Sequence, residues 1–278
     1  MDNVINSEQA TELIIEKARS VVDQLIENRG HANPPFLPRD FARLLGVKTV
    51  LADDLGDTSG ILLRFPDGYV IKVNQKHSLS RQGFSCAHEI GHILFSELRL
   101  ETYINSIEHR RLNSDGEQKD HYKARERLCD AAATELLMPE LVFKKNLSEL
   151  GVSIYSVERL ADMFKVSLQA AAIRMAEVSS IPCIAILWKP WPKLKMKKLK
   201  MAWCIGPGIK QLGGSPYVPV HINITNSSVI YKTYQFDVST KCYKLFKRGD
   251  NIKRLLVESK SFGFGETRYV FSLAFVNQ

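Results

Sequence analysis

Two histidines stand four residues apart in His88-Glu89-Ile90-Gly91-His92, and this spacing constrains the fold more than any other feature of the sequence. On an α-helix the two side chains differ by only about 40° around the axis, so both imidazole rings can reach one ion. Apolar residues interleave with the motif at helical spacing, namely Phe84, Ala87, Ile90, Leu94 and Phe95. This pattern predicts a largely buried helix, and buried polar side chains need a partner such as a metal ion.

Zinc is the ion that the motif predicts. Neutral imidazole is a preferred zinc ligand, and a catalytic zinc ion keeps three protein ligands and one water, whose pKa it lowers toward neutrality. Glu89 is suited to be the general base that takes a proton from this water. With 7 histidines among 278 residues, a chance match to H-E-x-x-H is roughly a one-in-a-hundred event. We therefore expect one Zn²⁺ per chain.

The third ligand has to come from a second element, and the helix-forming run from Arg125 to Pro139 offers two carboxylates. Glu126 and Asp130 are four residues apart and share one helix face. Glu126 can therefore bind the metal while Asp130 accepts the outward N–H of a ligand histidine. The alanines at 131–133 would let this helix approach the histidine helix closely. His121 is the alternative third ligand, although it lacks a paired carboxylate four residues further on.

These two segments resemble the ImmA/IrrE metallopeptidases, which are zinc proteins of the gluzincin kind. The resemblance lies in residues 81–92 and 126–139, the second ending in Glu-Leu-Leu-Met-Pro, and its clear part covers residues 55–140. Gly83 departs from the pattern, since members often carry a basic residue there. The resemblance implies that His88, His92 and Glu126 are zinc ligands and that Glu89 is the general base. It also implies that Asp130 accepts a hydrogen bond from a ligand histidine.

A gluzincin usually adds a Tyr or His that stabilises the oxyanion formed from the substrate carbonyl. Four residues between the two predicted helices are candidates for this role: Tyr103, His109, His121 and Tyr122. The sequence does not distinguish among them.

Two β-rich runs precede the histidine helix, Gly60 to Phe65 and Tyr69 to Asn74, and Pro66-Asp67-Gly68 between them predicts a hairpin. The second run leads directly into the helix, so we expect it to be the edge strand along which an extended substrate lies. Its residues are Tyr69, Val70, Ile71, Lys72, Val73 and Asn74. An ordinary pair of sheet strands explains the same pattern equally well.

Charge is distributed unevenly along the chain. Residues 1–180 carry 22 basic and 26 acidic side chains, whereas residues 181–278 carry 16 basic and 4 acidic ones, a net charge of +12. The basic part contains Lys189 to Lys200, in which Lys alternates with Leu and Met, and β-like runs from Val229 to Val238 and from Arg268 to Val276. Its cationic face could bind nucleic acid, an acidic nucleotide or an acidic protein, and a solubilising sheet surface is an equally good explanation.

A helix-turn-helix pattern spans Val157 to Met175, with Ser167 as a candidate N-cap of its second helix. Only Gln169 and Arg174 of that helix could read base edges, and the region is not basic. We therefore favour a packing role over DNA binding. Two more helices are predicted before the sheet, at 7–28 and at 38–46.

The fold class that these features predict is α+β, in three parts. Residues 1–145 form a zincin-like metallopeptidase domain, residues 146–180 a helix-turn-helix-like segment, and residues 181–278 a basic α/β domain. For the last part the family resemblance suggests a regulatory, sensor-like and GAF-like domain. The chain has no apolar stretch of transmembrane length and no signal peptide, so we expect a cytoplasmic protein without a membrane partner. Its five cysteines show no pairing pattern, and we expect Cys86 and Cys129 to be small packing residues.

The predicted function is a zinc endopeptidase that acts on a protein. The resemblance implies that the substrate is a helix-turn-helix repressor, whose cleavage switches on genes of a mobile element or of a stress response. The alternative is a non-enzymatic regulator that uses a zincin-derived fold to bind a protein, DNA or an effector. Glu89 favours the enzyme, because a module that only binds has no chemical need for a general base.

Overall fold

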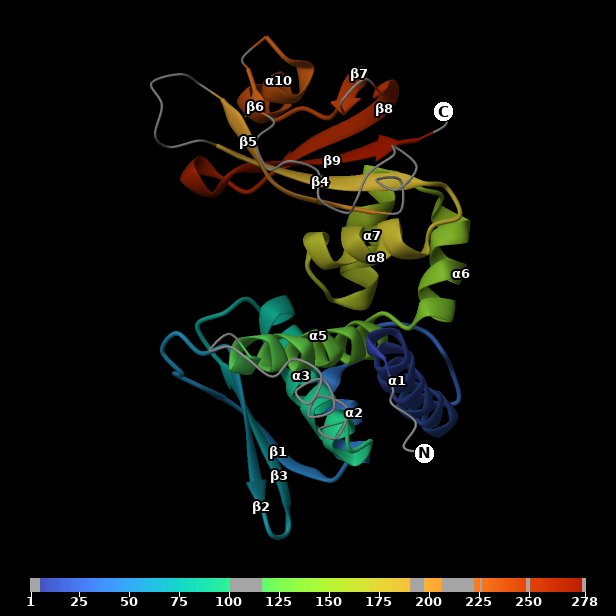
Figure 1. The fold of residues 1–278 in the computed structure, drawn as a ribbon, viewed down its shortest axis with the longest axis vertical. Helices are drawn as coiled ribbons and strands as arrows, with labels where there is room; N and C mark the ends of the chain where they lie inside the picture. Colours follow the sequence, from blue (N-terminus) through green and yellow to red (C-terminus); the bar gives the residue numbers. More distant parts are fainter. Residues whose placement is uncertain are drawn as a thin grey trace. The chain divides into compact units, whose positions relative to one another are not determined.

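The computed structural model describes residues 6–100, 117–190, 198–206, 223–225, 227–248 and 251–276. The chain forms two compact units. The N-terminal unit comprises residues 1–143 with 162–167, and the C-terminal unit comprises residues 144–161 with 168–278. Helices and strands occur in both units (Figure 1), which confirms the predicted α+β class. No helix in the described ranges is both long and apolar enough to span a membrane.

In its described residues, the N-terminal unit combines helices with a small sheet. Its elements are α1 (Ser7–Arg29), α2 (Pro38–Leu44), β1 (Val47–Asp53), β2 (Gly60–Phe65), β3 (Gly68–Asn74), α3 (Leu79–Glu97) and α5 (Glu117–Leu137). Asn6 caps α1, because its side chain accepts hydrogen bonds from the backbone N–H groups of Glu8 and Gln9. Buried Ala10, Ile14 and Ala18 give α1 an apolar face.

The three strands are arranged in the order β1-β3-β2, with β1 parallel and β2 antiparallel to β3. The predicted hairpin of β2 and β3 is confirmed. The expectation that Tyr69 to Asn74 is an edge strand is wrong, because β3 is the central strand and is paired on both sides. Asn74 is fully buried, and its Nδ2 donates to the carbonyl oxygens of Gly56 and Thr58, which orders the loop that leads into β2.

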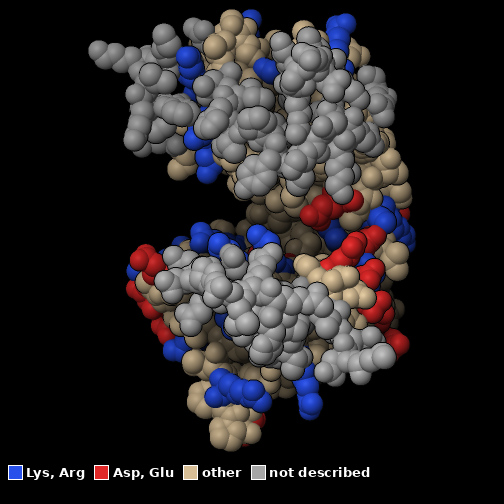
Figure 2. Space-filling model, in the orientation of Figure 1, with Lys and Arg blue, Asp and Glu red and all other residues tan. Residues whose placement is uncertain are grey.

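The C-terminal unit is built on a six-stranded antiparallel sheet in the order β6-β5-β4-β9-β8-β7. Its strands are β4 (Cys183–Pro190), β5 (Leu199–Ile205), β6 (Asn223–Ile224), β7 (Thr240–Arg248), β8 (Asn251–Phe262) and β9 (Tyr269–Phe275). One face packs with α10 (Val229–Phe236) around a core that includes Trp188, Met201 and Val257. Over this sheet, Figure 2 shows mainly basic and neutral side chains among the coloured residues, whereas the N-terminal unit carries both signs.

The β-like run from Val229 to Val238 is therefore a wrong prediction, since most of it is helix α10. Ser228 caps this helix by accepting the Ile230 N–H, and Asp237 ends it in a left-handed conformation. Ile230 and Tyr231 are buried, so the apolar positions fit a helix face packed on the sheet better than a strand. The run from Arg268 to Val276 does contain a strand, β9. The middle of the predicted Lys189–Lys200 strand, residues 191–197, lies outside the described residues.

Three helices precede the sheet: α6 (Glu140–Leu150), α7 (Ile154–Phe164) and α8 (Leu168–Val178). Helices α7 and α8 correspond to the predicted helix-turn-helix pattern. Arg174 of α8 is only 8% exposed, so this candidate for reading base edges is not available to DNA. On α7, Glu158 accepts hydrogen bonds from Lys260 of β8. These contacts support the packing role.

Candidate metal centre

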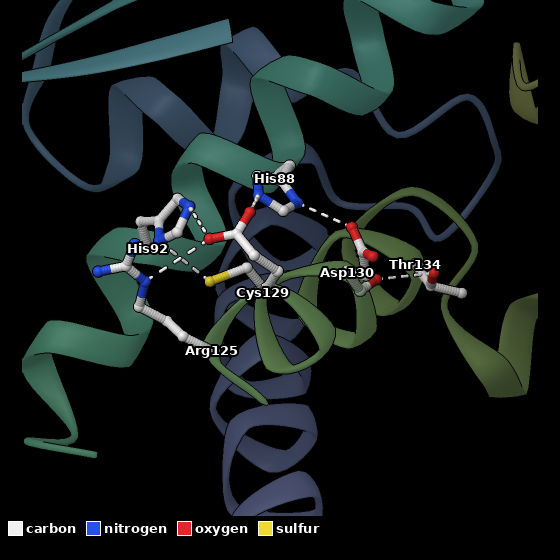
Figure 3. A network of polar contacts seen from close by, with 7 residues as sticks. His88, His92, Arg125, Cys129, Asp130 and Thr134 are labelled. Atoms are coloured by element: carbon white, nitrogen blue, oxygen red, sulfur yellow. Dashed lines mark hydrogen bonds and ion pairs between the residues drawn. The ribbon is translucent and has the colours of Figure 1, made fainter. Parts of the chain in front are cut away.

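The two predicted metal-binding helices bring His88, His92 and Glu126 together (Figure 3). His88 Nε2 is 3.1 Å from Glu126 Oε2, and His92 Nε2 is 3.7 Å from Glu126 Oε1. The two imidazole rings are 4.9 Å apart between centroids and nearly perpendicular, at 79°. Each of the three side chains offers one ligand atom, and these atoms lie within 4.8 Å of one another.

The outward nitrogens of the two histidines also have partners. His88 Nδ1 donates to Asp130 Oδ1 at 2.8 Å, in the position predicted for the acceptor behind a ligand histidine. His92 Nδ1 lies 3.2 Å from the Sγ atom of Cys129. Cys129 is buried, and burial raises the pKa of its thiol far above the ordinary value. It is therefore a neutral contact for the ring and not a thiolate ligand.

The pKa values of the two histidines are shifted in opposite directions. Burial lowers the pKa of His88, but the hydrogen bond and charge of Asp130, together with the charge of Glu126, outweigh it, so the pKa is raised overall. Burial and the charge of His88 lower the pKa of His92 to about 4. His92 is thus neutral at pH 7. A cation bound to His88 Nε2 would lie beside the Glu126 carboxylate, while Asp130 keeps the hydrogen bond from Nδ1.

Helices α3 and α5 can approach this closely because residue 91 is a glycine. A Cβ atom at Gly91 would lie 2.8 Å from the carbonyl oxygen and 2.9 Å from the Cα of Cys129. Both of these are backbone atoms that cannot turn aside. The prediction assigned close approach to the alanines of α5 and missed Gly91. A glycine inside an otherwise well-formed helix, where it costs about 1 kcal/mol relative to alanine, was the available signal.

Glu89 is buried between α3 and the start of β2. A Cβ atom at Gly60 would lie 2.8 Å from Glu89 Oε1, so this strand passes directly over the carboxylate. The backbone N–H of Leu62 donates to Glu89, yet burial dominates and raises the pKa of the carboxyl group above its ordinary value. Sequence reasoning did not identify Gly60, because its role depends on a contact between distant segments.

Glu89 and the three predicted metal ligands line a pocket of about 530 Å³. Residues of the loop before β2 line it together with Arg81, Phe84, His88, Glu89, His92, Tyr122, Arg125 and Glu126. Of the four candidates for the oxyanion, only Tyr122 can be placed in it. Tyr103, His109 and the side chain of His121 lie outside the described residues, and with them the rival third ligand. Arg125 lines the pocket and was not singled out from the sequence.

The donor set fits a zinc ion. Bonds of about 2.0–2.2 Å in a tetrahedral site separate the donor atoms by about 3.5 Å. His88 Nε2 is 3.1 Å from Glu126 Oε2 and His92 Nε2 is 3.7 Å from Glu126 Oε1, so each histidine lies near this separation from one of the two carboxylate oxygens. Two imidazoles and one carboxylate are also a ligand set that leaves a coordination position for water. The residues present therefore suit a catalytic type of site.

Fold and site together define a metallopeptidase-like centre on an α+β scaffold. Residues 43–176 match the family model of the IrrE N-terminal-like domain, Peptidase_M78. The chain therefore contains an IrrE N-terminal-like domain of the M78 metallopeptidase family. The resemblance predicted from the sequence motifs is confirmed, and the matched range extends beyond residues 55–140 on both sides.

Two similar proteins illustrate this relationship. The chain is 32% identical over 126 residues to the radiation response metalloprotease IrrE of Deinococcus radiodurans, a match that covers 45% of this chain and 36% of that protein. The chain thus spans little more than a third of the length of this curated relative. A Mycobacterium tuberculosis transcriptional regulator has a similar structure, with a TM-score of 0.59 and 15% identity, over 97% of this chain and 94% of the other. At this identity the similarity concerns the fold alone.

Proposed function

We propose that the chain is a zinc-dependent endopeptidase that cuts a helix-turn-helix repressor and thereby relieves the repression of genes of a mobile element or a stress response. The observation that carries the proposal is that Glu89 lines the same pocket as His88, His92 and Glu126. A buried carboxylate beside a metal-binding group has a chemical use in hydrolysis, whereas burial without such a use only costs stability. Membership in a metallopeptidase family supports the same reaction class.

In the proposed site, His88, His92 and Glu126 would hold the zinc ion. When bound there, zinc would lower the pKa of an attacking water and polarise the substrate carbonyl. Glu89 takes a proton from the water and later delivers it to the nitrogen of the leaving amine. The raised pKa of Glu89 suits both steps. Asp130 holds His88 in the tautomer whose Nε2 is free to bind a metal, because it accepts the hydrogen bond of Nδ1.

We further propose that the substrate lies along the start of β2. Strand β2 is at an edge of the sheet, and its first residue, Gly60, lines the pocket together with Thr58 and Ser59. Main-chain pairing with an edge strand holds a peptide in extended form and tolerates varied side chains. A repressor would need a locally unfolded or exposed segment to bind in this way.

The experiment combines the purified chain, zinc and a candidate substrate, which is any helix-turn-helix repressor that the next reading frame on the genome encodes. We expect one discrete cleavage of the repressor by the natural chain. Glu89→Gln should retain zinc and cut about 100- to 10,000-fold more slowly, because it lacks the proton acceptor. Glu97→Gln is the matched control, since Glu97 lies on the same helix and makes a surface ion pair with Lys17. It should cut at the natural rate.

Two outcomes would contradict parts of the proposal. Equal cutting by Glu89→Gln would show that another group accepts the proton. A zinc-loaded natural chain that binds the repressor without cutting it would instead favour the non-enzymatic regulator.

A further inference from the structure

Arg125 lines the pocket and carries a positive charge. The reaction outlined above gives this charge no role. It precedes Glu126 on α5, and its Nε atom is 3.6 Å from Glu126 Oε1. Its guanidinium carbon lies 5.5 Å from the ring centroid of Tyr122, one helical turn earlier, in a cation–π contact. These two contacts hold the guanidinium beside the metal-binding group (Figure 3).

The hydrogen-bonding capacity of Arg125 is incompletely used. Its Nε is buried and has no hydrogen-bond partner within the described part of the chain. The separation of 3.6 Å from Glu126 is an ion-pair contact and is too long for a good hydrogen bond. The side chain as a whole is 43% exposed, so part of the guanidinium remains accessible. A guanidinium carries five N–H donors in a fixed planar arrangement, which suits recognition of a negatively charged oxygen.

Arg125 lines the same pocket as Glu89 and His92. Its positive charge therefore lies close to the point where the scissile peptide would be attacked in the proposed reaction.

Two other polar side chains of the pocket, those of Arg81 and Tyr122, are less suitable than Arg125 for binding a negatively charged oxygen. Arg81 lies near the start of α3, is exposed, and donates from Nη2 to the hydroxyl oxygen of Ser59 at 3.1 Å. Tyr122 is 57% exposed, and its ring lies beneath the Arg125 guanidinium. Tyr122 is thus placed to orient Arg125.

We propose that Arg125 is a catalytic residue that donates hydrogen bonds to the carbonyl oxygen of the scissile peptide and stabilises the negative charge that develops there. The inference rests on the proposed peptidase function. In the balanced reaction, the water oxygen forms a bond to the carbonyl carbon, and the C–N bond then breaks. Glu89 moves the proton from water to the leaving nitrogen. Arg125 keeps all its protons, and the carbonyl oxygen returns to its neutral double-bonded form when the amine leaves.

The test compares Arg125→Ala with Arg127→Ala, a matched control two residues further along the same helix and exposed. Cleavage of the candidate repressor substrate gives kcat and KM, and zinc content is measured for each variant. We expect Arg125→Ala to lower kcat by about 100- to 1,000-fold with a small change in KM, as for loss of one oxyanion donor. Zinc content should not fall, because removing a cation beside Glu126 does not weaken its hold on a metal. Arg127→Ala should match the natural chain.

A purely structural role for Arg125 predicts a different pattern. If the residue only positioned Glu126, Arg125→Ala would lose zinc, and added guanidinium ion would not restore a rate. We expect millimolar guanidinium to restore part of kcat in Arg125→Ala and to leave Arg127→Ala unchanged. An unchanged kcat, or a loss of rate that follows a loss of zinc, would overturn the assignment.

A binding measurement separates this inference from the peptidase proposal. N-phosphoryl-leucyl-tryptophan resembles the tetrahedral stage of hydrolysis, and calorimetry gives its affinity for the zinc-loaded chain. We expect Arg125→Ala to weaken its binding about 10- to 100-fold, the range for hydrogen bonds to a charged group, and Arg127→Ala to leave it unchanged. Binding that depends on Arg125 in a chain that cuts nothing would show that Arg125 binds a negatively charged oxygen, but it would contradict the peptidase and with it the catalytic role of Arg125. Cleavage and binding that both ignore Arg125 would contradict this inference alone, and a chain that neither cuts nor binds would overturn both.

Discussion

The crossing of α3 and α5 and the six-stranded sheet use polar groups in opposite ways. In the sheet, Trp188 Nε1 donates to Ser272 Oγ at 3.0 Å, and Ser272 is in turn 2.7 Å from Ser259, so these buried groups satisfy one another. At the helix crossing, the imidazoles and carboxylates face a pocket instead. For Glu89 and His92, burial outweighs the effect of the neighbouring groups, and such a cost is often tied to function. The contrast favours the N-terminal unit as the place of the proposed reaction.

The largest effect is expected when the carboxylate of Glu126 is removed. Glu126→Ala deletes the third ligand and should weaken zinc binding by more than about 100-fold, which is more than the loss caused by removing a residue that only hydrogen-bonds to a ligand. His121→Ala should stay near the natural affinity. Zinc affinity is measured by competition with a chelator of known strength. The reverse order of the two variants would transfer the ligand role to His121.

A smaller effect is expected when the space between α3 and α5 at Gly91 is filled by a side chain. Gly91→Ala pushes a methyl group against the backbone of Cys129, so we expect a loss of about 1–3 kcal/mol of unfolding free energy despite alanine's higher helix propensity. Gly83→Ala is the matched control on the same helix, because its nearest neighbour would be Pro38 Cγ at 3.9 Å. It should stabilise the chain by up to about 1 kcal/mol. Denaturant unfolding of both variants gives the comparison.

If both glycine variants are stabilised alike, then α3 and α5 are not held at the separation seen here. The geometry of the metal centre would then need another explanation, because the separation of the helices sets the distance from His88 and His92 to Glu126.

The sequence predicted best where chemistry fixes the spacing of residues. His88, His92, Glu126 and Asp130 are brought together as expected, because residues four apart on a helix share a face whatever surrounds them. The prediction that β3 is an edge strand was wrong because β3 has a second partner strand that the sequence pattern did not reveal. Strand β1 was not recognised, and its parallel pairing with β3 is a long-range contact that local pattern does not reveal.

Residues that act through contacts between distant segments also escaped prediction. Gly60 and Gly91 matter because no Cβ atom fits against Glu89 and Cys129. Arg125 gains its meaning only from the pocket that it faces. For α10, apolar residues were assigned the period of a strand although the helical period fits. Short apolar runs are ambiguous between the two unless the caps are recognised, and here Ser228 is the cap.

The smallest expected effect concerns the sheet. Ile186 is 1% exposed in the core of the C-terminal unit, and Ile186→Val removes one methyl group, which costs about 0.5–1.5 kcal/mol of stability. The core needs volume and not a particular chemistry, so zinc affinity and the cleavage rate per zinc-loaded chain should stay within about twofold, a difference of about 0.4 kcal/mol. The measurement pairs denaturant unfolding with chelator competition on the same preparation. A tenfold loss of zinc affinity would mean that packing in the sheet is coupled to the metal centre, and the functional contrast between the two regions would no longer hold.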